Sequence, residues 1–372
     1  MVRFSKYVGV RLTMVILHVA QLYNNPCSGV EVVVPKHIIK QQEKEKVALI
    51  NLSSVNIEGV NNQFSFCRLK NLDGLPKPFD KPDLVVFHEV YKPGFLRIAK
   101  YFKNLKIPYI VVPHVCLTLN AQKIKRLKKR IANFLFFNSF VLNARAIHCL
   151  SEKEKEQTNF KVEKFVCPNG VELPTMQKRV SQDTNTEIVY IGRLDRGHKG
   201  LDILIDAIAL IKDFLLVNKV TIKLYGPDYN GTVKFLTQQI VERDIVKIVE
   251  LHGSVVDEDK SRVLTKTNIF IQTSRFEGMP MGVLEALSYG KPCIATKGTT
   301  LAEIINEYDA GWGVEGNAES ISNAIKQAII ERQRWHVLSL NARKLVEENF
   351  SWGVVASNTI KKYYEIINDD KC

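Results

Sequence analysis

Short apolar runs alternate with amphipathic stretches along the whole 372-residue chain. The apolar runs are typical of buried strands, and the stretches between them repeat apolar residues at helical spacing. The predicted strands of the first half are 15–20, 47–52, 84–88, 109–113, 146–150 and 164–167. Those of the second half are 187–191, 220–225, 248–252, 269–273 and 292–295, with helices at 201–212, 229–243, 318–331 and 333–349. This alternation predicts an α/β protein whose parallel sheets are covered by helices on both faces.

A polar segment without clear periodicity, residues 174–185, separates the two halves and predicts a linker. We therefore predict two Rossmann-like doubly wound domains, 1–176 and 177–351, facing each other across a cleft. In open sheets of this type, ligands bind at the carboxyl ends of the strands. A length of 372 residues allows each domain its own core.

The composition is that of an ordinary globular protein, with 45% hydrophobic and 24% charged residues. The seven cysteines are odd in number and lack CxxC spacing, which favours reduced thiols and a cytoplasmic protein over a disulfide framework. No apolar run is long enough to span a membrane. Residues 8–20 are interrupted by Arg11 and His18, so we interpret their second half as a strand rather than a signal peptide.

Positive charge is concentrated in the first half. Residues 1–180 contain 29 Lys and Arg against 13 Asp and Glu, whereas the remainder contains 23 against 26. Six of the basic residues lie in residues 123–131. Apolar residues recur at helical spacing in and just after this segment, namely Ile124, Leu127, Ile131, Phe134 and Leu135. Such a helix can lie on an anionic membrane, or its apolar stripe can pack on the sheet while the lysines are solvated. We favour peripheral attachment to a membrane; no RNA-binding motif supports nucleic acid as a partner.

The most informative motif lies in residues 275–287, where seven residues separate Glu277 from Glu285. Gly278, Pro280 and Gly282 form a loop that opens a helix, and free N–H groups at a helix start bind phosphate. Glu285 lies about one turn further on, where it can bind a ribose diol, and Glu277 can face a sugar. These parts fit a nucleotide-sugar; the alternative is surface charge around a helix start.

Two further motifs follow predicted strands of the second half. Arg193 and Lys199 lie in residues 192–200, where a guanidinium and an ammonium can neutralise a diphosphate; the alternative is a solvated basic turn. His252-Gly253 ends another strand, and a glycine there lets the backbone approach a planar base.

With these motifs in place, the chain resembles a retaining GT-B glycosyltransferase of family four over nearly its whole length. The residues that carry the resemblance are Pro26 to Glu31, Pro113-His114, Pro168 to Val171, Gly192 to Gly200, His252-Gly253 and the paired glutamates Glu277 and Glu285. Two positions depart from the family pattern. Ser28 stands where many relatives have a glycine, and so does Val115.

The resemblance implies a role for each matching residue. Arg193 and Lys199 would contact the diphosphate, Glu285 the ribose, and Glu277 the donor sugar. Backbone N–H groups around Gly278, Met279, Pro280, Met281 and Gly282 would hold phosphate and sugar hydroxyls. His114 would lie near the sugar, the Ser28-Gly29 loop near the diphosphate, and residues 352–372 would return to the first domain.

The expected reaction moves a hexose from a UDP- or GDP-sugar to a hydroxyl of a saccharide acceptor with retention, and we expect neither a metal nor a cofactor. The acceptor is expected to be lipid-linked, at the cytoplasmic face of a membrane, in cell-surface polysaccharide or glycolipid biosynthesis. Two alternatives stay open. A sugar-nucleotide epimerase shares this fold, and a non-catalytic nucleotide-sugar-binding protein would share the site.

Two other motif matches are discounted. Asp257-Glu258-Asp259 matches a metal-binding DxD pattern, but we interpret it as acidic residues before a helix at 261–267. Residues 311–316 match GxGxxG, but a helical stretch precedes them, so we interpret them as a connection and predict no NAD.

Overall fold

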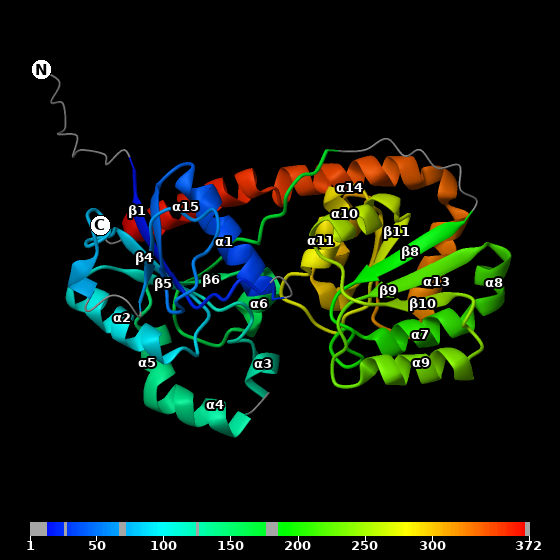
Figure 1. Ribbon diagram of the computed structural model, residues 1–372, viewed down its shortest axis with the longest axis horizontal. Coiled ribbons are helices and arrows are strands. Elements are labelled where there is room, and N and C mark those ends of the chain that lie inside the picture. The colour runs from blue at the N-terminus through cyan, green and yellow to red at the C-terminus, as the bar shows by residue number, and fades with distance from the viewer. Residues whose placement is uncertain (1–12, 26–27, 67–71, 124–125, 176–184, 369–372) are drawn as a thin grey trace, which may run out of the picture. The chain divides into compact units, whose positions relative to one another are not determined.

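The computed structural model describes residues 13–25, 28–66, 72–123, 126–175 and 185–368. Contacts divide the chain into two compact units (Figure 1). The first consists of Met1–Pro168 with Val355–Cys372, and the second of Asn169–Val354. The first boundary between the units follows Pro168, whereas the sequence analysis predicted it after residue 176. The second boundary follows Val354, whereas the prediction was after residue 351.

The first unit is built on a seven-stranded parallel sheet with the order β3-β2-β1-β4-β5-β6-β7. Its strands are β1 Val15–Ala20, β2 Lys46–Asn51, β3 Gln63–Ser65, β4 Leu84–His88, β5 Tyr109–Val112, β6 Ala146–Cys149 and β7 Lys164–Val166. Its helices are α1 Gly29–Gln42, α2 Pro93–Asn104, α3 Leu119–Lys123, α4 Arg126–Ala132, the π-helix Asn133–Phe137, α5 Asn138–Leu142, α6 Glu152–Gln157, the short 3-10 turn Leu72–Gly74 and α15 Trp352–Asn368, which begins in the second unit.

The second unit has a six-stranded parallel sheet with the order β10-β9-β8-β11-β12-β13. Its strands are β8 Thr186–Ile191, β9 Val220–Tyr225, β10 Val249–His252, β11 Ile269–Gln272, β12 Cys293–Thr296 and β13 Gly311–Val314. Its helices are α7 Leu201–Leu210, α8 Lys212–Val217, α9 Thr232–Glu242, α10 Asp257–Lys266, α11 Met281–Ser288, α12 Ala302–Glu307, α13 Ala318–Ile330 and α14 Trp335–Asn349, with 3-10 turns Lys297–Thr299 and Arg332–Arg334.

Both sheets reverse their strand order next to their first strand, as doubly wound folds do. The reversal lies between β1 and β4 in the first unit and between β8 and β11 in the second. The predicted fold class of two Rossmann-like units, as in GT-B proteins, is confirmed. We call these two places the first and second switch points.

Each sheet buries apolar residues on both faces, which explains the continuous apolar runs of its strands. In the second unit, α7, α9 and α13 cover one face through residues such as Leu204, and α11, α12 and α14 cover the other through residues such as Leu284. Figure 1 labels all of these helices except α12. In the first unit, α2 and α5 cover one face, where Phe87 lies among Phe95 and Phe140.

Local signals in the sequence fix several element ends. Pro93 opens α2 at a position where a missing N–H costs nothing, and the Asn317 side chain accepts a hydrogen bond from the N–H of Ser320 to cap α13. Gly170 packs against Trp352, the first residue of α15, and a Cβ at this position would lie 2.4 Å from the Trp352 ring. A glycine is therefore required where the chain of the Pro168–Val171 motif passes this tryptophan.

Candidate functional site

The second switch point brings together two of the predicted motifs. The loop after β8 contains Arg193 and Lys199, and the loop after β11 leads through Glu277 to α11. Because β8 and β11 are adjacent and parallel, both loops leave the same carboxyl edge of the sheet. The strand order, which the sequence alone does not give, is what places these motifs side by side.

Glu277 and Lys199 form an ion pair, with the Lys199 Nζ 2.9 Å from the Glu277 Oε1. The same oxygen accepts hydrogen bonds from the Gln272 amide at 2.9 Å and from the Ser274 hydroxyl. The two charged side chains are only 17% and 9% exposed, so solvent screens the pair weakly. Glu277 is thus held in one position by donors from three residues.

Arg193 is the more exposed of the two predicted cations, with 44% of its side chain accessible. Its guanidinium lies 4.1 Å from the centre of the Tyr229 ring and 2.9 Å from the Asp195 carboxylate. The other oxygen of Asp195 accepts hydrogen bonds from the N–H groups of Gly197 and His198. Asp195 therefore shapes the loop and orients Arg193 at once.

The start of α11 offers a group of backbone donors. Among the hydrogen bonds of the described residues, none uses the N–H of Gly278, Met279, Met281 or Gly282, while Pro280 has no N–H to offer. A Cβ at Gly282 would lie 3.1 Å from the carbonyl oxygen of Ile191, the last residue of β8. The glycine thus lets the positive end of α11 approach the strand end, and such an arrangement can bind an anion.

Glu285 lies one turn into α11, as the sequence predicts, but its carboxylate forms an ion pair with Lys260 of α10. The side chains are 22% and 29% exposed, respectively. A ribose diol bound to Glu285 would share this carboxylate with the Lys260 ammonium.

His252 and Gly253 lie at the end of β10, on the same edge of the second sheet. The His252 ring stacks on that of Tyr225 with a centroid distance of 4.5 Å, and its Nε2 lies 2.9 Å from a Glu250 carboxylate oxygen. A Cβ at Gly253 would meet no atom within 4 Å, so the space beside this glycine is open.

The first unit carries the remaining predicted residues. Ser28 is the N-cap of α1 and Gly29 its first residue, and the Ser28 side chain makes no capping hydrogen bond. His114 follows β5, and both His114 and Val115 have positive φ angles, 48° and 63°. A β-branched residue rarely adopts this conformation, so Val115 is strained where relatives of the resembled family often have glycine.

Buried groups hold this strained loop from two sides. The Glu154 carboxylate accepts hydrogen bonds from the N–H of Val115 at 2.6 Å and from that of Leu150 at 2.7 Å. The His114 Nε2 lies 3.2 Å from the Nδ1 of His88, whose own Nε2 lies 2.8 Å from His18. Burial lowers the pKa of His114 from 6.5 to about 3, and the pKa of His88 well below 6.5.

Sequence reasoning missed several residues that the structure places around the predicted ones. These are Gln272 and Ser274 on Glu277, Asp195 on Arg193, Lys260 on Glu285, and His18, His88 and Glu154 behind His114. A usable signal existed for some of them, since His18, His88 and Gln272 are polar residues inside or at the end of otherwise apolar strands.

The two discounted motifs need partial correction. The acidic residues Asp257, Glu258 and Asp259 are themselves the first turn of α10, which begins four residues earlier than predicted, and the N-cap is Val256 without a side-chain bond. Residues 311–316 are not a connection: Gly311–Val314 form strand β13, which pairs with β12. Glycine has a low preference for strands, but pairing with β12 stabilises this edge strand despite its two glycines. Among the described residues, no group of three or more His, Cys, Asp or Glu side chains is placed to hold a metal ion.

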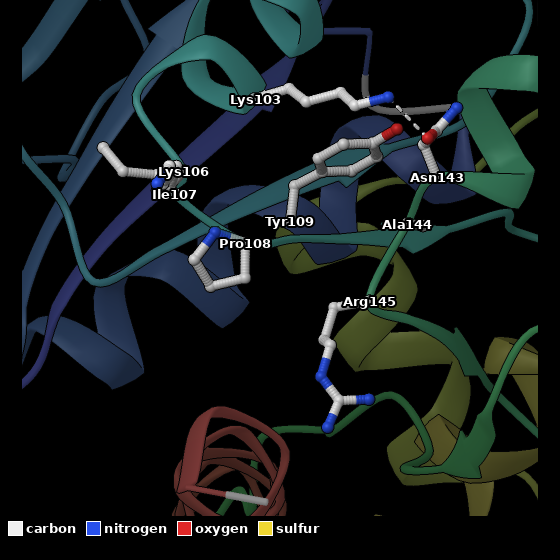
Figure 2. Close-up of a pocket in the computed structure, with 8 residues that line it drawn as sticks. All are labelled: Lys103, Lys106, Ile107, Pro108, Tyr109, Asn143, Ala144 and Arg145. Atoms are coloured by element: carbon white, nitrogen blue, oxygen red, sulfur yellow. Dashed lines mark hydrogen bonds between the residues drawn. The ribbon is translucent and has the colours of Figure 1, made fainter. Parts of the chain in front are cut away.

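A cavity of about 400 Å³ lies in the first unit, at the edge of the sheet opposite to the carboxyl ends of its strands (Figure 2). Its lining includes Tyr109, which opens β5, and Arg145, which precedes β6, so it lies at the amino ends of these strands. The Lys103 ammonium on its rim is hydrogen-bonded to Asn143 at 2.6 Å (Figure 2). Ligands of doubly wound sheets bind at the other edge, so we do not assign the nucleotide-sugar to this cavity.

The basic segment of the first unit forms α4 and the following π-helix. Its predicted apolar stripe is not packed on the sheet: Leu127 is 73% exposed and Phe134 82%, and Ile131, Leu135 and Phe136 are more than half exposed. Phe137 is the residue that turns inward, against Tyr91. Ile124, Lys125 and Pro26-Cys27 lie outside the described residues. Two of these five exposed residues belong to α4 and three to the π-helix that follows it; for brevity we call all five the apolar face of α4.

Residues 174–345 match the family model described as Glycosyl transferases group 1. The chain is 27% identical over 290 residues to the uncharacterized glycosyltransferase MJ1178 of Methanocaldococcus jannaschii, covering 77% of this chain and 76% of that protein. It is 28% identical over 178 residues to the O-antigen chain mannosyltransferase B of Escherichia coli, covering 47% and 45%. That second match spans less than half of the relative.

Solved structures share the fold over a larger part of the chain. The Anabaena protein Alr3699/HepE, crystallised with UDP, superposes with a TM-score of 0.70 at 20% identity, covering 95% of this chain and all of that one. The same Anabaena protein has also been crystallised with UDP-glucose.

Proposed function

We propose that this chain, whose residues 174–345 match the family model described as Glycosyl transferases group 1, transfers a hexose from a UDP- or GDP-sugar to a hydroxyl of a saccharide acceptor with retention of configuration. The observation that carries the proposal is the pairing of Lys199 with Glu277 beside the free N–H groups of α11, at the second switch point. These groups lie together at the carboxyl ends of neighbouring strands. The cation and the N–H groups suit a diphosphate, and the carboxylate suits the hydroxyls of the sugar bonded to it.

The chemistry follows from where charge develops. Cleavage of the bond between sugar and diphosphate leaves negative charge on the leaving group, and fixed donors stabilise it most when they are already in place. Arg193, Lys199 and the backbone N–H groups of Gly278, Met279, Met281 and Gly282 are such donors. The Lys199 ammonium has three N–H bonds, so it can keep Glu277 and still reach a phosphate oxygen. We propose that these groups make a metal ion unnecessary.

The two glutamates take different parts in the proposed complex. Glu277 accepts hydrogen bonds through Oε1 and can direct its second oxygen to the hydroxyls of the transferred sugar. Glu285 binds the ribose diol and keeps Lys260 as a partner. No general base is assigned, and the leaving phosphate takes the proton of the acceptor hydroxyl. His114 contacts the sugar as a neutral ring, since its pKa of about 3 makes it a poor base at neutral pH.

The apolar face of α4 supports a lipid-linked acceptor. Five large apolar side chains in one short helical segment are exposed, and the segment is rich in lysine and arginine. Burying such a face in an anionic bilayer surface gains hydrophobic and electrostatic free energy together. No helix of the described residues is long and apolar enough to cross a membrane. We propose peripheral attachment at the cytoplasmic face, in the synthesis of a surface polysaccharide or glycolipid.

The donor is tested by thermal shift with UDP, GDP and ADP and with the hexose derivatives of UDP and GDP. A ligand at 100 times its Kd adds about 2.7 kcal/mol to the free energy of unfolding, which raises Tm measurably. Transfer is then measured with the stabilising donor, an added saccharide acceptor and EDTA. Conversion of the donor sugar without any acceptor would indicate an epimerase, and no shift or turnover with any donor would overturn the proposal.

Membrane attachment is tested by flotation with vesicles of phosphatidylglycerol and phosphatidylcholine. The variant Phe134→Ser/Phe136→Ser is expected to float less than the wild type, because two of the exposed aromatic rings are removed. Leu210→Ser, at a 63% exposed position of the second unit, is the matched control. Neutralising Lys125, Arg126, Lys128 and Lys129 is a second arm. Full flotation of both sets of variants would exclude this segment as the membrane contact.

A further inference from the structure

Three histidines form a continuous line across the first sheet. His18 lies in β1 opposite Val86 of β4, His88 is two residues further along β4 and opposite Val112 of β5, and His114 follows two residues after Val112. Side chains alternate along a strand, so the three rings project from one face of the sheet and step towards its carboxyl edge. Gln41 of α1 meets the inner end of the line.

Each ring is hydrogen-bonded to the next. The Gln41 Oε1 lies 2.8 Å from the Nε2 of His18, the His18 Nδ1 lies 2.8 Å from the Nε2 of His88, and the His88 Nδ1 lies 3.2 Å from the Nε2 of His114. His18, His88 and Gln41 are almost fully buried, whereas His114 is partly accessible at the outer end. The line therefore connects a buried amide to the proposed sugar-contacting residue.

The direction of these hydrogen bonds is set at the inner end. A carbonyl oxygen can only accept, so the Nε2 of His18 must carry a proton to donate to Gln41. The Nδ1 of a neutral His18 then accepts from His88 Nε2, and the Nδ1 of a neutral His88 accepts from His114 Nε2. His114 is left protonated on Nε2, with a lone pair on Nδ1.

The surroundings keep the rings neutral. Burial is the largest cause that lowers the pKa of His18 to about 4, and burial with the neighbouring histidines lowers that of His88. Among the described residues, no carboxylate is hydrogen-bonded to any of the three rings. The rings also lie in series rather than around one point, and no metal-binding group is found among the described residues.

We propose that Gln41, His18 and His88 are positioning residues that fix His114 as its Nε2–H tautomer, so that Nδ1 presents a hydrogen-bond acceptor to a hydroxyl of the donor sugar. The tautomer is a property of the first unit alone, and its use in sugar binding rests on the proposed function. No proton is transferred in this arrangement. The hydrogen-bonded series acts by determining which ring nitrogen of His114 is unprotonated and can accept a hydrogen bond.

The tautomer is measured by NMR of the full-length protein labelled with ¹⁵N-histidine, in which the two ring nitrogens of each tautomer differ in shift and coupling. The signals of His114 are assigned with His114→Asn. We expect the Nε2–H form of His114 to exceed the other by about tenfold, because the reverse form would break the hydrogen-bonded series. A wild-type His114 protonated on Nδ1 would overturn the proposal.

Gln41→Met removes the acceptor and should let His114 populate both tautomers. Gln42→Met, at the next position of α1, is the control, since the Gln42 amide donates instead to the Val47 carbonyl. An unchanged His114 tautomer in a folded Gln41→Met variant would contradict the proposal. If that variant fails to fold, the wild-type spectrum still decides, because a wild-type His114 protonated on Nδ1 contradicts the proposal by itself.

Activity provides the second readout. Gln41→Met is expected to lower kcat/KM for the nucleotide-sugar roughly fivefold to tenfold, the value of one hydrogen bond, while the affinity for the free nucleotide stays unchanged. An equal loss of nucleotide affinity would indicate general structural damage and contradict a role confined to the sugar. Absence of any transfer by the wild type, with the NMR result as expected, would refute the proposed function and leave the tautomer assignment standing.

Discussion

The two switch points of this protein share a strand order and differ in how they accommodate polar groups. At the first, between β1 and β4, neutral histidine rings are hydrogen-bonded in series, with pKa values lowered by burial. At the second, between β8 and β11, the charges remain and are paired, Lys199 with Glu277 and Arg193 with Asp195. The same strand order therefore accommodates hydrogen-bonded neutral side chains at one switch point and paired charged side chains at the other.

The difference follows from depth. His18 and His88 lie within or at the end of strands and are nearly inaccessible, where an isolated charge would cost too much. Lys199 and Glu277 lie in loops beyond the strand ends and retain some contact with water, so pairing is enough to keep them charged. A diphosphate requires such charge, whereas an uncharged sugar hydroxyl is served by a neutral acceptor.

The largest effect is expected where the charges are removed. The double variant Arg193→Met/Lys199→Met should lower kcat by about 10⁴-fold or more, because each fixed donor at a developing anion is worth about 10²–10³. Lys212→Met, which breaks the exposed pair with Asp244, is the control and should retain full activity. The measurement is kcat from steady-state kinetics. An unchanged kcat in the double variant would show that the second switch point does not take part in catalysis.

Acid should destabilise the first unit through its histidines. An unfolded histidine binds a proton near pH 6.5, but burial lowers the folded pKa of His18 and of His148 to about 4. Below pH 6.5 the unfolded chain therefore binds more protons than the folded chain. The free energy of unfolding decreases as the pH is lowered from 6.5 to about 4. The loss is on the order of 3 kcal/mol for each such histidine.

Urea denaturation at pH 7.5, 6 and 5 measures this loss, with far-UV circular dichroism as the probe, because the three tryptophans of the chain all lie in the second unit. His18→Phe is not a clean variant, since it would leave Gln41 and His88 without partners. A free energy of unfolding that stays constant from pH 7.5 to 5 would contradict burial of neutral histidines.

A smaller, favourable effect is expected at the strained loop. Val115→Gly should raise the free energy of unfolding by about 1 kcal/mol, because glycine adopts the φ of 63° without the steric cost that a valine bears. The N–H to Glu154 is kept in this variant. Val166→Gly, in β7, is the contrasting substitution and should destabilise the protein. A Val115→Gly variant less stable than the wild type would show that the valine side chain packs favourably enough to outweigh its strain.

The smallest effect concerns the partner of Glu285. Lys260→Met frees this carboxylate, and we expect KM for the nucleotide-sugar to fall by about twofold to fivefold, the range of a partly exposed ion pair. Lys266→Met, on the same helix and exposed, is the control. A rise in KM would mean that Lys260 itself binds the donor.

The sequence by itself determined the class of fold and most of the charged residues of the candidate site. Apolar runs separated by amphipathic stretches predicted every strand except β3 and β13. Those two are short edge strands whose residues, such as Gly311, have little strand preference and are held by pairing with a neighbour. Glycines and charges around Arg193, Lys199, Glu277 and Glu285 marked the proposed donor site because helix starts and phosphate chemistry leave local signals.

Only the tertiary structure decided which groups meet. The pairing of Lys199 with Glu277 depends on β8 lying next to β11, and the line from Gln41 to His114 depends on β1, β4 and β5 being neighbours. The exposure of the apolar face of α4 was likewise undetermined, since one stripe of residues fits both a core and a membrane surface. Local patterns specify elements, whereas hydrogen bonds and ion pairs between residues far apart in sequence depend on strand order and register.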